Sequence, residues 1–139
     1  MTRVDFHFNV ADKIDYGCRL IRKVRKAGQR AVVFCDDEVR LRRFDEALWT
    51  FAPLEFIPHT ASSDPLAART PVLLASREAE LPHHEVLVNL GSTLPRFFTR
   101  FERLVEVVGA DPEDRAQARQ RYRYYKDRGY PLATHEVGA

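Results

Sequence analysis

The chain is expected to fold as an α/β domain, with a largely parallel sheet covered by helices on both faces. Strand-like apolar runs alternate with helix-like segments, which is the pattern of successive β–α units. One of these runs, Ala31–Phe34, is apolar without interruption, as expected for a strand buried on both faces. With 139 residues, 45% of them hydrophobic and 30% charged, the chain fits a single domain spanning residues 1–139.

The first half of the chain predicts two strand–helix units. Residues 3–8 alternate as a short strand, and Asp12 or Asp15 can cap a helix that Gly28 ends. Ala31–Phe34 is the second strand. The helix that follows it is expected to run to residue 48.

Three consecutive acidic residues, Asp36, Asp37 and Glu38, precede this second helix. They could form a metal or acid–base cluster. Asp is, however, a preferred N-cap residue, and negative charge is favourable at a helix N-terminus. Capping by Asp36 or Asp37 is therefore the preferred interpretation.

The second half predicts three more strands and two helices. The expected elements are a small-residue loop at 60–69, strands at 72–76, 86–90 and 104–108, a turn at 82–84 and a short helix at 94–101. The last helix is the best marked, with Asp111 as N-cap, Pro112 in its first turn and Gly129 directly after its end.

No segment predicts a catalytic or cofactor site. Residues 9–14, after the first strand, contain no glycine, so the domain is expected to lack the phosphate loop of nucleotide-binding α/β folds and not to bind nucleotides. His83, His84 and Glu85 could suggest a metal, but neighbouring strand residues point to opposite faces, so a polar turn is preferred. Neither Cys18 nor Cys35 lies in a nucleophile signature. We expect a protein that is not an enzyme, with no cofactor and no metal.

The net charge and the hydropathy pattern limit the binding partners and the cellular location that the sequence predicts. A formal net charge of +2 is too small to predict nucleic-acid binding, so any basic site must be local. No apolar run is long enough to span a membrane, and the first residues lack the apolar core of a signal peptide. A cytoplasmic protein with two reduced, buried cysteines is expected.

The last helix carries a local excess of positive charge, because residues 113–128 include six basic and three acidic side chains. Arg119, Tyr122, Arg123 and Lys126 follow helical spacing and form one stripe. Cations beside an aromatic ring suit a peptide that ends in acidic residues and an apolar C-terminal side chain. Two alternatives stay open: an ordinary solvated face, and direct binding of single-stranded DNA by stacking on tyrosines 122, 124 and 125.

A second unusual feature is the aromatic segment that follows the second helix. Trp49, Phe51, Phe56, Pro58 and His59 lie within eleven residues, more than a short segment can readily bury. Exposed aromatic residues are typical of partner-binding surfaces. The alternative is that Trp49 caps the core beneath the helix.

These two segments, FDEALWTFAPLEFIPH at residues 44–59 and RQRYRYYKDRGYPL at 119–132, resemble motifs of the chi subunit of bacterial DNA polymerase III. The motifs occur in the family's order and at a similar separation, so the resemblance spans nearly the whole chain. It implies a three-layer α/β/α fold reminiscent of nucleotide-binding proteins. It also implies a non-catalytic accessory subunit of the replicative polymerase.

The resemblance further implies two partners. Arg119, Tyr122 and Arg123 match positions that bind the acidic C-terminal tail of single-stranded DNA-binding protein, through which DNA is reached indirectly. Trp49 and Phe56, with Pro58 and His59, match positions that meet the psi subunit of the clamp loader. Whether psi or another protein, such as a repair helicase, uses this second site is left open.

Overall fold

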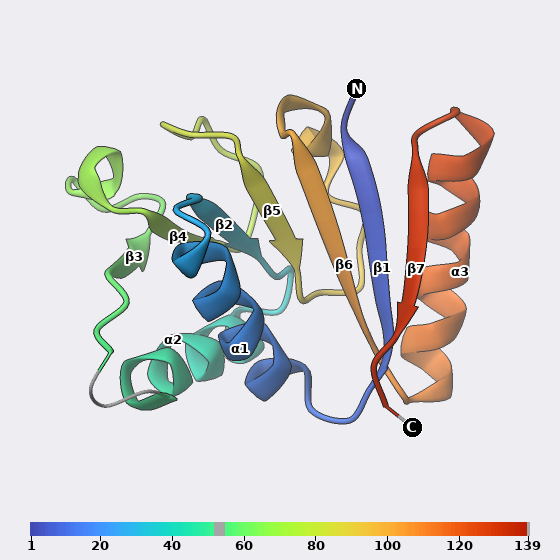
Figure 1. The fold of residues 1–139 in the computed structure, drawn as a ribbon, viewed down its shortest axis with the longest axis horizontal. Coiled ribbons are helices and arrows are strands. Elements are labelled where there is room, and N and C mark those ends of the chain that lie inside the picture. Colours follow the sequence, from blue (N-terminus) through green and yellow to red (C-terminus); the bar gives the residue numbers. More distant parts are fainter. Residues whose placement is uncertain (52–54, 139) are drawn as a thin grey trace.

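The computed structural model describes residues 1–51 and 55–138. Within these ranges, seven strands form one sheet in the order β3-β4-β2-β5-β6-β1-β7, and all neighbours are parallel (Figure 1). The elements are β1 (Arg3–Val10), α1 (Lys13–Lys26), β2 (Ala31–Phe34), α2 (Glu38–Phe51), β3 (His59–Ala61), η1 (Ala67–Arg69), β4 (Val72–Ala75), β5 (Val86–Asn89), η2 (Arg96–Arg100), β6 (Arg103–Gly109), α3 (Pro112–Asp127) and β7 (Leu132–Glu136).

The molecule has three layers, as predicted. α1 and α2 pack on one face of the sheet, while α3 and the 3₁₀ helix η2 pack on the other (Figure 1). Strand β2 serves both cores, because Val33 faces the α1–α2 side and Val32 faces the α3 side. Both residues are fully buried, which explains the unbroken apolar pattern of this strand.

The predicted starts of the three long helices are confirmed by their caps, while α2 runs to Phe51, beyond its expected end at residue 48. Asp12 accepts hydrogen bonds from the amides of residues 14 and 15, Asp37 from those of residues 39 and 40, and Asp111 from that of residue 114. Gly28 and Gly129 follow α1 and α3 with φ angles of +76° and +78°. This left-handed conformation favours glycine, so both glycines end their helices as expected.

The two edge strands escaped prediction. β3 begins at His59 and overlaps the region expected to be a loop, which also contains η1, and β7 follows the last helix. β3 has only three residues and β7 is mostly exposed, so neither carries the apolar pattern on which strand prediction depends. Parallel pairing to an apolar neighbour, β4 or β1, creates them instead.

Two connections also differ in detail from the prediction. The segment expected as a helix at 94–101 contains the 3₁₀ helix η2. β4 and β5 both pair with β2 in parallel, so the turn expected at 82–84 is part of a longer crossover. His83 in this crossover is buried instead of lying on a polar turn. Burial lowers the pKa of its imidazole and favours the neutral ring.

Both cysteines lie in the core, as the sequence predicts. Cys18 and Cys35 are buried free thiols, and burial raises the pKa of Cys18 to about 12. Neither thiol is activated, since reactive cysteines have lowered pKa values. No helix in the described part of the chain is long and apolar enough to cross a membrane.

Candidate protein-binding surfaces

Helix α3 is anchored to the sheet by a buried polar network. Arg121 lies 3.1 Å from Glu106 of β6, and both side chains are almost completely buried. The same carboxylate accepts a hydrogen bond from Tyr125 at 2.7 Å and another from Asn89 at 2.9 Å. Burial and the Glu106 charge raise the pKa of Tyr125, so its hydroxyl remains a donor. The network fixes the rotation of α3 about its own axis.

This network changes the interpretation of the helix charge. Arg121 counted as a surface cation in the sequence, but it belongs to the core. Asp114 also does not contribute to the exposed charge, because it pairs with Lys13 of α1 at 3.1 Å. One cation and one carboxylate are removed together, so the exposed part of the segment keeps its positive excess.

The predicted stripe lies on the solvent side of α3. Arg119, Arg123 and Lys126 are exposed, and Tyr122 is half-buried with its ring edge-on to Phe6, 5.3 Å between centroids. The structure therefore brings all four predicted residues onto one surface, which we call the α3 surface. Two cations and the tyrosine lie within one turn of each other.

An apolar hollow of about 240 Å³ adjoins the α3 surface, between α3 and the β1–β7 edge of the sheet. Its lining includes Phe6 and Phe8 of β1, Ala118 and Tyr122 of α3, and Thr134 of β7. Arg119 and Arg115 also line this hollow. The hollow can take one apolar side chain while the arginines face a carboxylate.

Of the residues that line this hollow, only Arg119 and Tyr122 were predicted as site residues. Arg115 stands one turn before Arg119 at helical spacing, a signal that was available in the sequence. Phe8 lies on the expected first strand, far from α3 in the sequence, and Thr134 could not be found because β7 itself was not expected. The missed edge strand thus supplies one wall of the site.

The α3 surface is a poor platform for stacking DNA bases. Tyr125 is fully buried. The ring of Tyr124 is covered by the guanidinium of Arg128, 3.6 Å from its centroid. Of tyrosines 122, 124 and 125, on which single-stranded DNA was expected to stack in the alternative interpretation, two are therefore buried or covered.

A second surface is formed by the aromatic segment after α2, which we call the aromatic surface. Trp49 is 51% exposed and Phe56 is 69% exposed, with 5.5 Å between their ring centroids. Pro58 is exposed beside them. Trp49 therefore does not cap the core, which was the alternative interpretation. Residues 52–54 of this segment lie outside the described ranges.

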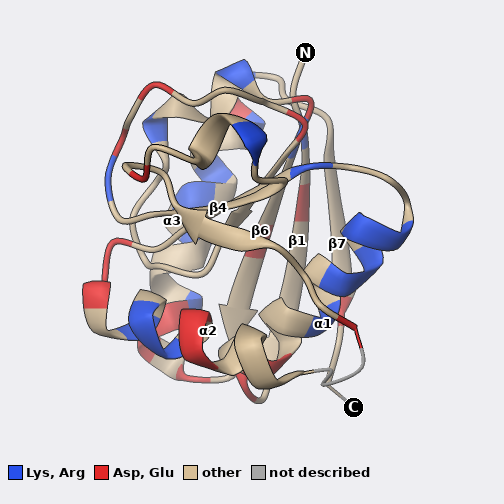
Figure 2. Cartoon of the chain, turned by 90° about the vertical axis from the view of Figure 1, so that its left-hand side faces the viewer, with Lys and Arg blue, Asp and Glu red and all other residues tan. Residues whose placement is uncertain are grey.

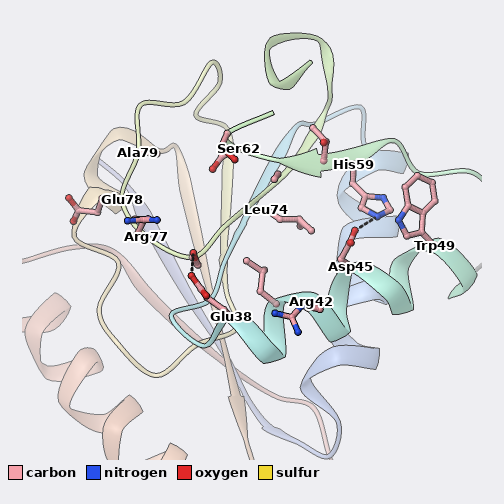
Figure 3. Close-up of a pocket in the computed structure, with 15 residues that line it drawn as sticks. Glu38, Arg42, Asp45, Trp49, His59, Ser62, Leu74, Arg77, Glu78 and Ala79 are labelled. Atoms are coloured by element: carbon pink, nitrogen blue, oxygen red, sulfur yellow. Dashed lines mark hydrogen bonds and ion pairs between the residues drawn. The ribbon is translucent and has the colours of Figure 1, made fainter. Parts of the chain in front are cut away.

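His59 supports the aromatic surface from below. It is buried, and its ring centroid lies 4.3 Å from that of Trp49. Its Nδ1 lies 2.8 Å from the carbonyl oxygen of Ile57, and its Nε2 lies 2.9 Å from Asp45 Oδ1 (Figure 3). The ring is thereby fixed between β3 and α2. Of the four residues predicted to bind the clamp-loader partner, Trp49, Phe56 and Pro58 are exposed. The fourth, His59, is buried and positions Trp49.

A hollow of about 620 Å³ continues from Trp49 between α2 and the β3–β4 edge. Figure 3 shows Arg42, Asp45 and Trp49 of α2 along one side of it, with Ser62 and Leu74 across from them. The hollow mixes polar and apolar groups. An aromatic anchor beside such a depression is the usual form of a protein-binding hot spot.

The carboxyl edge of the sheet, where nucleotide-binding folds hold phosphate, is occupied by the chain's own carboxylates. Asp12, Asp37 and Asp111 already accept the amide hydrogens at the starts of α1, α2 and α3. Asp36 does not cap α2 but accepts hydrogen bonds from Ser92, from its amide at 2.9 Å and its hydroxyl at 3.2 Å. A phosphate would have to displace these contacts. No group of three or more metal-ligating side chains occurs among the described residues.

Fold and surfaces together define a class of protein: a parallel α/β/α domain with a basic helix surface and a separate exposed aromatic surface. A model of the family described as DNA polymerase III chi subunit, HolC, matches residues 1–133. The chain belongs to this family. It is 34% identical to the DNA polymerase III subunit chi of Pseudomonas aeruginosa, over 99% of this chain and 98% of that protein. The subunits chi of Haemophilus influenzae and Escherichia coli are 29% and 28% identical, over 89% and 84% of this chain and 87% and 80% of their own lengths.

Proposed function

We propose that this chain is a non-catalytic adaptor subunit of the DNA polymerase III holoenzyme in the cytoplasm. It links the clamp loader, through psi or an equivalent protein, to the acidic C-terminal tail of single-stranded DNA-binding protein. The observation that carries the proposal is the pairing of an apolar hollow with exposed cations on the α3 surface. An acidic peptide with an apolar last residue needs both features in one place.

On the α3 surface, the last side chain of the tail enters the hollow against Phe6 and Tyr122. The terminal carboxylate faces Arg119, and the preceding acidic residues lie along Arg123 and Lys126. The buried Arg121–Glu106 pair holds the helix in the rotation that presents these side chains together. Rigid presentation lowers the entropic cost of binding.

On the aromatic surface, Trp49 and Phe56 anchor the clamp-loader partner, with Pro58 at their side. The surface is mainly apolar and lies at the far end of the sheet from β7 (Figure 1). Two partners can therefore bind at once, which an adaptor requires. A repair helicase that uses the same anchors would compete with the clamp loader.

The α3 half is tested by fluorescence anisotropy with a labelled peptide of the tail. Arg123→Glu is expected to remove most of the affinity, while Arg42→Glu, an equal charge change on the exposed face of α2, leaves it intact. Amidation of the peptide C-terminus is expected to weaken binding, because the terminal carboxylate is a recognised group. Equal binding by the parent and Arg123→Glu proteins would remove the α3 surface from the proposal.

A further inference from the structure

A third surface lies on the opposite face of the sheet from α3. Helix α1 packs over β6 and β2 and leaves the same face of β1 and β7 without a helix. His7 of β1 and His135 of β7 are aligned there in parallel register, with 5.4 Å between their ring centroids. A groove of about 610 Å³ runs between these strands and α1.

Among the residues that the structure describes, the charged side chains that line the groove are all basic. Its five basic residues are Arg19, Arg22, Lys23, Lys26 and Arg103. Three of them have carboxylate partners, which lie outside the lining: Asp15, Glu55 and Asp5. Within the described residues, Lys23 and Lys26 form no ion pair, and both are exposed on one side of α1, where Figure 2 shows its basic residues as blue bands.

His7 lies beside these cations as a neutral ring. Its pKa is lowered from 6.5 to about 4, first by burial and then by the charges of Arg103 and His135. Its ring is therefore neutral at physiological pH. Nδ1 of His7 is hydrogen-bonded to the hydroxyl of Tyr16, and the two rings meet edge-on.

The groove thus combines a row of cations on α1 with three planar rings, those of Tyr16, His7 and His135, beside it. Cations that follow a backbone of negative charge, next to rings on which bases can stack, form the general arrangement of single-strand-binding grooves. A peptide of acidic residues would use the cations but leave the rings without a partner. The apolar hollow that such a peptide needs lies on the other face, beside α3.

We propose that this groove binds single-stranded nucleic acid, with phosphates along Arg19, Lys23 and Lys26 and bases against Tyr16 and the histidines. The site goes beyond the adaptor function, since it would let the chain touch directly the strand that its protein partner covers. It is also independent of that function. The two sites lie on opposite faces and share no residue, so either can fail alone.

The test measures binding of a labelled oligothymidylate of about 15 nucleotides, near the upper site size of one single-strand-binding domain. Fluorescence anisotropy at low salt compares the parent with Lys23→Glu/Lys26→Glu. The matched control is Arg123→Glu/Lys126→Glu, which carries the same change of net charge on the α3 surface. All four substituted side chains are exposed, so both proteins are expected to fold, which circular dichroism checks.

The groove variant is expected to bind at least about tenfold more weakly than the control variant, because its substitutions face the phosphates. A neutral variant, Lys23→Gln/Lys26→Gln, is expected to reduce the slope of log K against log salt by about 1.4, or about 0.7 for each lost phosphate contact. Absence of oligothymidylate binding by the parent at low salt would overturn the proposal. So would an equal loss in the groove and control variants, or competition by polyglutamate as strong as that by unlabelled oligothymidylate.

Discussion

The α3 surface and the aromatic surface solve the problem of binding a partner in opposite ways. The first presents charge and is held rigid by a buried ion pair, since Arg121 and Glu106 fix the helix beneath its exposed cations. The second presents the exposed rings of Trp49 and Phe56, and Trp49 packs on the buried His59 of β3. A surface that recognises charge must hold several side chains at fixed positions relative to one another. A surface that uses an aromatic anchor needs only one ring packed firmly against the core. The two surfaces should therefore fail in different ways when they are altered.

The largest expected effect comes from breaking the anchor of α3. Arg121→Ala leaves Glu106 buried without its cation, which costs about 3–5 kcal/mol of unfolding free energy. Urea denaturation measures this loss. Arg123→Ala on the exposed side is the matched control, and it is expected to stay within about 0.5 kcal/mol of the parent. Comparable stability of the two variants would mean that the buried pair does not hold the helix.

Removal of the aromatic anchor is expected to have the next largest effect, on binding instead of stability. Trp49→Ala is expected to cost about 2 kcal/mol of clamp-loader affinity, or about thirtyfold, because a hot-spot ring is lost. Titration calorimetry measures the affinity. Since Trp49 is already half exposed, the unfolding free energy should change little. A variant that melts while Phe56→Ala keeps full affinity would show that Trp49 is structural.

The two surfaces are also expected to differ in how strongly salt weakens partner binding. Exposed charge contacts are screened as the Debye length falls from about 10 Å at 0.1 M to about 3 Å at 1 M salt. Binding of the acidic tail to the α3 surface is therefore expected to weaken and to keep an apolar remainder. Binding at the aromatic surface is expected to change much less. Parallel salt titrations of both complexes by anisotropy check the difference, and equal slopes would erase the distinction between the surfaces.

The smallest expected effect concerns pH. Because the pKa of His7 in the folded protein is about 4, below its ordinary 6.5, the unfolded chain takes up a proton first as the pH falls. The stability that the neutral ring contributes above pH 6.5 is therefore lost as the pH drops toward 4. After solvent screening of this half-buried ring, the loss is about 1 kcal/mol. Urea denaturation across this range should show a flatter pH dependence for His7→Gln, and identical profiles would contradict the shift.

The fold was largely predictable because local signals mark its central elements. Asp12, Asp37, Asp111 and the two glycines define helix ends by chemistry that does not depend on the rest of the fold. β2 is predictable because it is apolar on both faces. The edge strands were not predictable, since only their pairing partners make β3 and β7 strands.

The candidate sites were predictable to a lesser extent. The stripe of Arg119, Tyr122, Arg123 and Lys126 follows helical spacing, so the sequence could place it on one face. The burial of Arg121 was missed because its charge suggested a surface position. One signal could have revealed it: Glu106 lies inside an apolar strand and needs a buried cation as its partner. The groove beside α1 draws its residues from separate elements, which only the folded chain brings together.

The central claim, that one chain joins two partners through separate surfaces, is tested most directly by a bridging experiment. The tail peptide of single-stranded DNA-binding protein is immobilised, and capture of the clamp-loader protein is measured with and without the chain. Capture is expected only when the parent chain is present. Arg123→Glu should lose the tail and keep the clamp loader, and Trp49→Ala should do the reverse. Mutual displacement of the two partners, or full bridging by both variants, would contradict the account.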